Sequence, residues 1–468
     1  MESIVTTPMQ DNANPHPPVT ISTMCKPFRV RSGWRSKRNV CIRPKRWDIF
    51  SNSGLIFFAF NSLLLIKMKI HCCILIPAVL LFVWGCTSSL PEKHSGISIS
   101  VPLSKGDNSI LLSNIVDSLH YIQLETTDEC LIGDIMKIYF IGDKLVIFDK
   151  DQTKSIYFYK QDGTFINKIS RIGQGPGEYI AITDITIKDN EEIIIWDIKS
   201  KKLLIYNFDG TFINNIEFPY WGRSIEYLGD DFLAMYCDYS SNPLFFEGKT
   251  SPNLVIFNLK TREAKHSLFF DKDINTQGIT IISNNLSLFR GQALLLPTLS
   301  NSIYNISKEG EEERYYLDFG MPFQKKISDY IEKTLPDISV YDIRTAEANS
   351  NLPFIKNILS SDDLIFFTYL FGSSFYYGFY YPESNTFLEA SAVIQENRPI
   401  ELIENDIDNT MSYWPRFIDA KNNFYCVLQP YLLHDRFKDS ENEILRNLIR
   451  NSKPDDNPII VKAFMKVL

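Results

Sequence analysis

The chain repeats a short strand-forming unit. The block Asp-Gly-Thr-Phe-Ile-Asn occurs at residues 162–167 and again at 209–214, which are 47 residues apart. Apolar runs flank each block, and Asp-Gly between such runs is a strong β-hairpin signal because these residues tolerate positive φ. Each block therefore predicts two antiparallel strands, and the two copies together predict a repeat fold.

A dense apolar strand that follows a polar turn occurs six times. The six segments are residues 145–149, 193–197, 232–236, 293–297, 364–368 and 424–428. We interpret them as the second strands of six similar units. Third strands are predicted at residues 254–258, 302–306 and 375–381.

Repeated units of about four strands favour blades arranged around an axis. Two stacked β-sandwiches would not predict one repeated unit. The predicted fold is all-β, a six-bladed β-propeller of four-stranded antiparallel blades, with short helical insertions at residues 323–335 and 440–450. The last blade lacks an outer strand. We therefore expect the segment 97–101 or 121–125 to supply it and close the ring.

The N-terminal region is typical of an export signal. An apolar stretch at residues 70–85 follows Lys67-Met68-Lys69 and ends at Cys86. Residues 83–86 (Val-Trp-Gly-Cys) resemble a bacterial lipobox, which implies that the Cys86 thiol is diacylated and becomes the new N-terminus. Two acyl chains give stable membrane anchoring. One or two transmembrane helices are the alternative interpretation.

Four regions follow from these patterns. We expect a non-native or disordered extension at 1–67, a lipoprotein signal peptide at 68–85, a tether at 86–96 and the propeller at 97–468. From Cys86 onward there are 37 basic and 53 acidic residues, and 37 minus 53 gives a charge of −16. Such an acidic body is a poor match for nucleic acid. The predicted location is the bacterial cell envelope, at the outer membrane or the cell surface.

Residues 171–179 read Arg-Ile-Gly-Gln-Gly-Pro-Gly-Glu-Tyr. This segment resembles the G-x-G-P-G-E-[FY] signature of bacterial six-bladed β-propeller lipoproteins, which are related in fold to NHL and TolB-like propellers. The resemblance covers about 97–468 and implies a fold and an envelope location, but no single activity. The flanking strands favour an inter-blade turn over a phosphate cradle. We retain Arg171, Glu178 and Tyr179 as candidate ligand contacts on the face of the inter-blade loops.

A second set of candidates comes from the starts of the innermost strands. These positions are Lys137, Asp184, Arg223, Asn284, Lys356 and Arg416. The four cations predict a partial ring at the channel mouth that suits an anionic or sugar-like ligand. Trp221 and Trp414 precede two of them in matching contexts. Ordinary strand-end charges beside buried tryptophans are the alternative interpretation.

No motif in the sequence points to a specific reaction. HExxH, GxSxG and P-loop patterns are absent, and the histidines and cysteines after Cys86 lack metal-ligand spacing, so no metal or cofactor is expected. The aromatic runs at 157–159 and 375–381 favour blade packing over carbohydrate stacking. The sequence favours a non-enzymatic module, anchored to the membrane, that binds a ligand or an envelope protein. A lyase or hydrolase acting at the channel, and a structural subunit of an envelope complex, stay open as alternatives.

Overall fold

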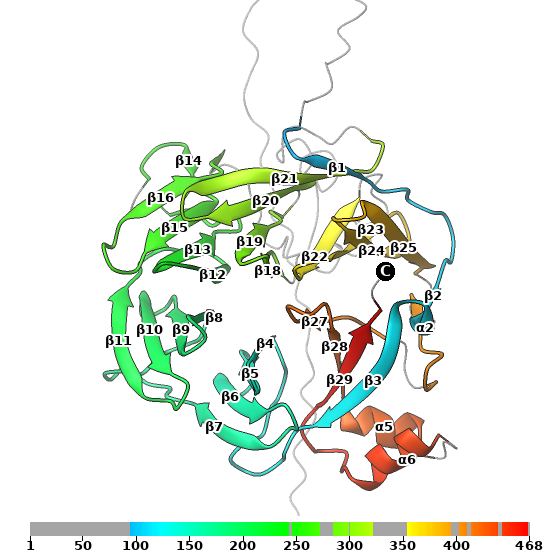
Figure 1. Cartoon of the computed structure of the whole chain (residues 1–468). Coiled ribbons are helices and arrows are strands. Elements are labelled where there is room, and N and C mark those ends of the chain that lie inside the picture. The colour runs from blue at the N-terminus through cyan, green and yellow to red at the C-terminus, as the bar shows by residue number, and fades with distance from the viewer. Residues whose placement is uncertain are drawn as a thin grey trace, which may run out of the picture. The chain divides into compact units, whose positions relative to one another are not determined.

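Six β-sheets surround a common centre in the computed structural model (Figure 1). The structure describes residues 94–242, 246–271, 284–298, 300–321, 353–394, 402–409, 413–438 and 442–466. These residues belong to one unit, Pro91–Leu468. Each sheet has antiparallel strands that run from the centre outward, so the predicted six-bladed β-propeller is confirmed.

Blades one to three come from the first half of the propeller. Blade one contains β4 (Lys137–Ile141), β5 (Lys144–Asp149), β6 (Ser155–Lys160) and β7 (Phe165–Ile169). Blade two contains β8 (Asp184–Lys188), β9 (Glu192–Asp197), β10 (Lys202–Asn207) and β11 (Phe212–Glu217). Blade three contains β12 (Ser224–Gly229), β13 (Phe232–Tyr236), β15 (Leu254–Asn258) and β16 (Ala264–Ser267). A short pair, β14 (Thr250–Ser251) and β17 (Phe270–Asp271), accompanies blade three.

Blades four to six complete the ring. Blade four contains β18 (Leu286–Phe289), β19 (Gln292–Leu295), β20 (Ser302–Ser307) and β21 (Gly310–Asp318). Blade five contains β22 (Phe354–Ser360), β23 (Ile365–Phe371), β24 (Ser374–Tyr381) and β25 (Thr386–Val393). Blade six contains β27 (Phe417–Ile418), β28 (Phe424–Leu428), β29 (Ile459–Met465) and the N-terminal strand β3 (Val116–Gln123). All six predicted second strands occupy the second position of a blade.

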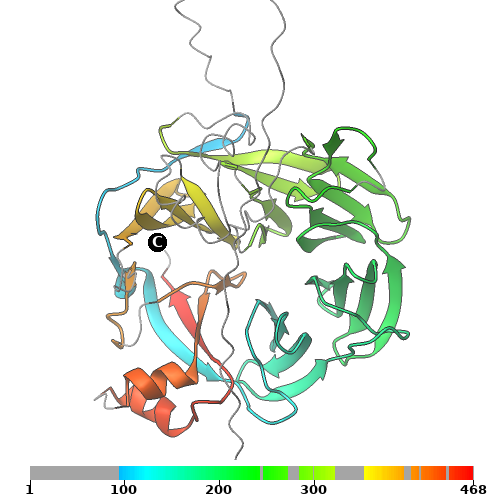
Figure 2. The same ribbon diagram turned by 180° about the vertical axis from the view of Figure 1, so that it is seen from behind.

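The two predicted closing strands have different roles. β3 pairs antiparallel with β29 and is the outer strand of blade six, so the segment near 121–125 closes the ring. The other candidate is wrong as a closing strand. β1 (Ile97–Ser100) instead pairs parallel with β21 and adds a fifth strand to blade four (Figure 2). From there the chain passes blade five, where β2 (Ile110–Leu111) pairs with β26 (Ile403–Glu404), before it reaches blade six.

Hydrophobic cores lie between the blades. Because side chains alternate across a strand, β5 packs Val146 and Phe148 against blade two and Leu145 and Ile147 against blade six. The described residues form six such clusters, one at each interface between neighbouring blades. Second strands are therefore apolar on both faces, which explains why they are the clearest signal in the sequence.

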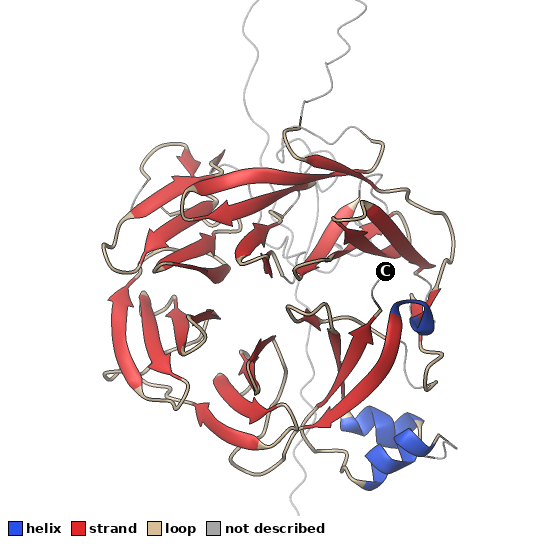
Figure 3. Ribbon diagram, viewed as in Figure 1, coloured by secondary structure: helices blue, strands red, loops and turns tan. Residues whose placement is uncertain are grey.

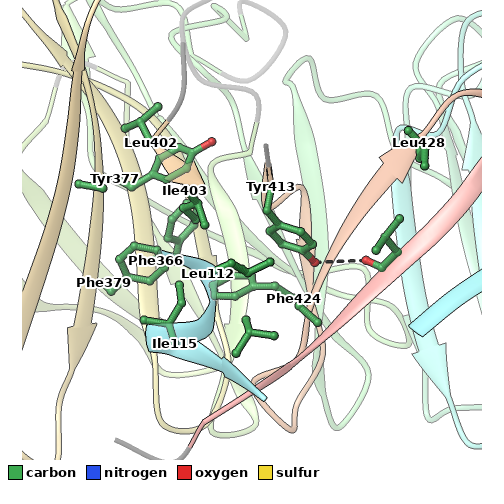
Figure 4. Close-up of a cluster of buried hydrophobic side chains, with 14 of the residues drawn as sticks. Leu112, Ile115, Phe366, Tyr377, Phe379, Leu402, Ile403, Tyr413, Phe424 and Leu428 are labelled. Atoms are coloured by element: carbon green, nitrogen blue, oxygen red, sulfur yellow. Dashed lines mark hydrogen bonds between the residues drawn. The ribbon is translucent and has the colours of Figure 1, made fainter. Parts of the chain in front are cut away.

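The interface between blades five and six illustrates this packing (Figure 4). Phe366 and Phe379 of blade five meet Phe424 of blade six, with ring centroids 5.2 and 6.1 Å from that of Phe424. The Tyr413 hydroxyl donates a hydrogen bond of 3.2 Å to the Val461 carbonyl. The aromatic run in β24 splits between two such cores, so its predicted packing role is confirmed.

Helices are few and short (Figure 3). They are α2 (Leu112–Ile115), α5 (Pro430–Arg436) and α6 (Glu443–Arg450). The predicted helix at 440–450 is present, but its N-cap is Asn442, whose side chain accepts hydrogen bonds from two backbone N–H groups of the first turn. The predicted helix at 323–335 lies outside the described residues. Within the part of the chain that the structure describes, no helix is long and apolar enough to cross a membrane.

Candidate functional site

A cavity of about 1410 Å³ lies among the inner strands of the propeller. Every blade contributes an inner strand to its lining, and one residue from each is Lys137, Asp184, Glu226, Ser287, Ser360 and Phe417. Loop residues such as Trp221 and Asp238 line it at the end where the inner strands begin. The cavity is therefore the central channel of the propeller, and we call it the channel.

One charged pair links the inner strands of blades one and two. The Lys137 ammonium lies 2.8 and 2.9 Å from the two carboxylate oxygens of Asp184, and it also donates a 3.3 Å hydrogen bond to the Ile185 carbonyl. The backbone N–H of Ile225, on blade three, donates to the same carboxylate at 2.9 Å. Burial opposes the charge on Lys137, but the neighbouring carboxylate of Asp184 outweighs it and raises the pKa of the ammonium.

Glu226 is the second buried acid of this wall. The side chain is 5% exposed, and the Thr186 hydroxyl donates a 2.7 Å hydrogen bond to its Oε1 atom. Burial raises the pKa of Glu226 to about 7, although the charge of Lys137 and the hydrogen bond from Thr186 both act in the opposite direction. A carboxyl with this pKa changes its charge near neutral pH.

The other cations of the channel also have partners. The Arg223 guanidinium lies 3.4 Å from the Asp238 carboxylate. Arg416 donates a 2.8 Å hydrogen bond to the Ile135 carbonyl and lies 3.8 Å from Asp134. The mouth therefore carries cations and acids side by side, which differs from the excess of positive charge implied by a cationic ring.

The wall formed by blades four and five contains uncharged polar groups. The Asn284 amide donates a 2.8 Å hydrogen bond to the Ile358 carbonyl. The backbone N–H of Ser360 donates to the Ser287 hydroxyl at 2.7 Å, and the Ser360 hydroxyl donates to the Leu288 carbonyl at 2.8 Å. One side of the channel is thus ionisable and the other side is neutral.

Tryptophans lie at two equivalent positions of the ring. Trp221 precedes the inner strand of blade three, is 45% exposed and lines the channel. Trp414 precedes the inner strand of blade six, is 40% exposed and packs beside Phe375 and Tyr377. The prediction that these rings are buried blade packing fails for Trp221, because nearly half of its surface is accessible.

Three of the four predicted inner-strand cations line the channel, namely Lys137, Arg223 and Arg416. Lys356 is not part of the lining. The pairing of β22 with β23 shifts register between Ile355 and Asn357, so Lys356 occupies a β-bulge. Counting back from the second strand does not detect such an extra residue.

The glycine-rich segment lies between β7 and β8 and forms a turn, and none of its residues lines the channel. Glu178 accepts a 2.7 Å hydrogen bond from the backbone N–H of Gly175. Tyr179 is fully buried, and its hydroxyl donates to the Lys154 carbonyl at 2.8 Å. Arg171 donates to the Gly210 carbonyl at 3.2 Å. The contacts of Arg171, Glu178 and Tyr179 join blades one and two.

The sequence reasoning missed Glu226, Ser224 and Asp238 in the channel lining. An acid inside an otherwise apolar inner strand, as in Ser-Ile-Glu-Tyr-Leu at 224–228, is the signal that identifies Glu226. Asp238 follows a second strand in the same way as Asp149 and Asp197. Within the described ranges, no group of three or more His, Cys, Asp and Glu side chains is arranged to hold a metal ion.

Known structures share the fold. A crystal structure from Bacteroides fragilis NCTC 9343, named "Putative exported protein", is 19% identical, with a TM-score of 0.63 over 79% of this chain and 100% of that chain. A member of the DUF4221 family from Bacteroides vulgatus is 11% identical, with a TM-score of 0.45 over 77% of this chain and 99% of that one. No curated protein matches the chain.

A family model matches residues 96–464, which span all six blades. The chain belongs to the family described as a domain of unknown function, DUF4934.

Proposed function

We propose that the protein is an exported, lipid-anchored propeller that binds a small polar ligand in its central channel. The observation that carries this proposal is the channel itself, which has a volume of about 1410 Å³ and a half-exposed tryptophan among its lining residues. Ligand sites are typically concave and combine aromatic surface with a few placed polar groups. Trp221 supplies the aromatic surface, and the ionisable and neutral walls supply the polar groups.

Ligand binding at this site is testable by thermal shift. The full chain, purified in a mild detergent because of its apolar N-terminal segment, is screened against neutral oligosaccharides and anionic metabolites. A ligand that binds the folded state raises the melting temperature. We expect Trp221→Ala to remove that shift and Phe269→Ala to retain it, because Phe269 is 54% exposed but does not line the channel. A shift that survives Trp221→Ala would contradict the proposal.

Export and anchoring rest on two supports. The first is the lipobox-like segment ending at Cys86, and the second is the fold shared with a protein whose name describes it as exported. Metabolic labelling with a radioactive fatty acid tests the anchor. We expect Cys86→Ala to abolish incorporation and Cys73→Ala, a cysteine within the apolar stretch, to leave it unchanged. Labelling that persists in Cys86→Ala would contradict lipidation at this residue.

A lyase or hydrolase acting in the channel is the second candidate function, and Glu226 is the observation that favours it. A carboxyl whose pKa is about 7 suits general acid–base chemistry at neutral pH. Product analysis of any bound oligosaccharide separates the two functions. Intact ligand after prolonged incubation supports a binding module, and shortened products that disappear in Glu226→Gln support an enzyme.

A further inference from the structure

The channel has little free positive charge for an anionic ligand. The Lys137 ammonium already has three acceptors, which are both oxygens of Asp184 and the Ile185 carbonyl. An ammonium has only three N–H donors, so this group is saturated. The Arg223 and Arg416 side chains contact acids of their own. An anion would have to break these contacts in order to bind.

The unused hydrogen-bonding capacity of the wall is mostly acceptor. Among the described residues, Glu226 receives a hydrogen bond only at Oε1, which leaves Oε2 without a donor. The Ser224 hydroxyl and the Asn285 side-chain oxygen are buried and have no hydrogen-bond partner. All three residues line the channel. Buried polar atoms without partners are rare in folded proteins, because each raises the free energy of the native state.

These three groups lie on neighbouring blades. Ser224 and Glu226 are two residues apart on β12, so their side chains project from the same face of the strand. Asn285 directly precedes β18, the inner strand of blade four, and β12 contacts β18. Trp221 comes three residues before Ser224 and lines the same channel.

We infer that the channel binds a neutral carbohydrate, whose hydroxyl groups donate hydrogen bonds to Glu226, Ser224 and Asn285 and whose ring stacks on Trp221. This inference rests on the proposed function and assigns its ligand class. A sugar supplies several hydroxyl donors on a rigid ring and an apolar ring face, which match the unpaired acceptors and the exposed indole. It brings no charge, so the Lys137–Asp184 pair stays intact.

The charge state of Glu226 then controls affinity. The titratable groups around it are Lys137 and Tyr139 from β4 and Asp184 from β8. Hydrogen bonds to an ionised acceptor are stronger than those to a neutral one. Since burial raises the pKa of Glu226 to about 7, the better acceptor predominates above that pH. Sugar binding should therefore weaken as the pH falls below 7.

Calorimetric titration of the full chain tests the inference. The probes are the neutral tetrasaccharides of glucose, mannose and N-acetylglucosamine, with tetragalacturonate as the anionic counterpart. We expect at least one neutral probe to bind, and to bind about tenfold more weakly at pH 5.5 than at pH 8.0. Glu226→Gln should weaken binding and remove the pH dependence. Ser224→Ala should also weaken binding, while Glu217→Gln, an exposed residue of β11, should change neither property.

Two results would overturn the inference. Tighter binding of tetragalacturonate than of every neutral probe would assign the channel to anions, and the proposed function would then survive with a different ligand class. Binding of a neutral probe that Trp221→Ala and Glu226→Gln both leave unchanged would place the sugar outside the channel, and the proposed function would fail with the inference.

Discussion

The Lys137 ammonium and the Asp184 carboxylate form an ion pair of 2.8 Å that joins blades one and two inside the channel. Only 21% of the Lys137 side chain and 6% of the Asp184 side chain are exposed. Removal of one partner from a buried pair leaves an uncompensated charge. We expect Lys137→Met to lower the free energy of unfolding by about 3 kcal/mol.

Chemical denaturation at pH 7 measures this change. The double variant Lys137→Met with Asp184→Asn is the control, because it removes both charges and should recover much of the lost stability. A single variant that unfolds within about 0.5 kcal/mol of the wild type would contradict a structural role for the pair.

Glu226 makes stability depend on pH in a direction opposite to that of most carboxyl groups. Its pKa is about 7 in the folded protein and 4.5 as an isolated side chain, so the folded state binds the proton more tightly. Its contribution is fully present below pH 4.5 and is lost as the pH rises through 7. The total loss is about 3 kcal/mol. Thermal denaturation between pH 5 and 8 should show this decline in the wild type and a flatter profile in Glu226→Gln.

The window of that experiment avoids a group with the opposite sign. Hydrogen bonds from Ser302, Ser95 and His94 outweigh burial and lower the pKa of Glu313 to about 2. Glu313 therefore stabilises the fold above pH 4.5 and loses that contribution only as the pH falls towards 2. A wild-type profile that rises from pH 5 to 8 would contradict the assignment of Glu226.

Ring closure depends on a close approach at Gly163. This residue has φ of +89°, and a Cβ atom there would lie 2.0 Å from the Gln123 carbonyl oxygen at the end of β3. We expect Gly163→Ala to destabilise the fold by at least about 2 kcal/mol, because strain and a backbone clash add together. Gly142→Ala is the matched control. Its φ is +60° with no atom within 4 Å of the added Cβ, so only the conformational cost of about 1 kcal/mol applies.

The turn at residues 171–179 should contribute to stability and not to binding. Tyr179→Phe removes a buried hydroxyl that donates to Lys154 and accepts from the backbone N–H of Arg171 at 3.1 Å. We expect a loss of about 1–3 kcal/mol in denaturation and an unchanged dissociation constant for the channel ligand. Weaker binding by the folded Tyr179→Phe variant would restore this turn as a ligand contact.

The repeat made the blade architecture predictable from sequence. Second strands such as Ile193 to Trp196 are buried against two neighbours at once, so they are apolar throughout and easy to recognise. The closing strand was harder to assign. β1 and β3 have similar composition, and only the path of the chain past blade five decides which of them reaches β29.

The site was only partly predictable. Lys137, Arg223 and Arg416 line the channel as expected, but their partners come from other blades and are not visible in sequence spacing. The bulge at Lys356 depends on how β22 pairs with β23. Glu226 gains its significance from Thr186 on the adjacent blade, a contact that exists only after the ring has formed.

A crystal structure of the protein with the tightest-binding neutral tetrasaccharide tests the central claim most directly. The account predicts a sugar ring stacked on Trp221, with a hydroxyl within hydrogen-bonding distance of the Glu226 carboxylate. A sugar bound on the outer surface of the blades, with an unoccupied channel, would contradict it.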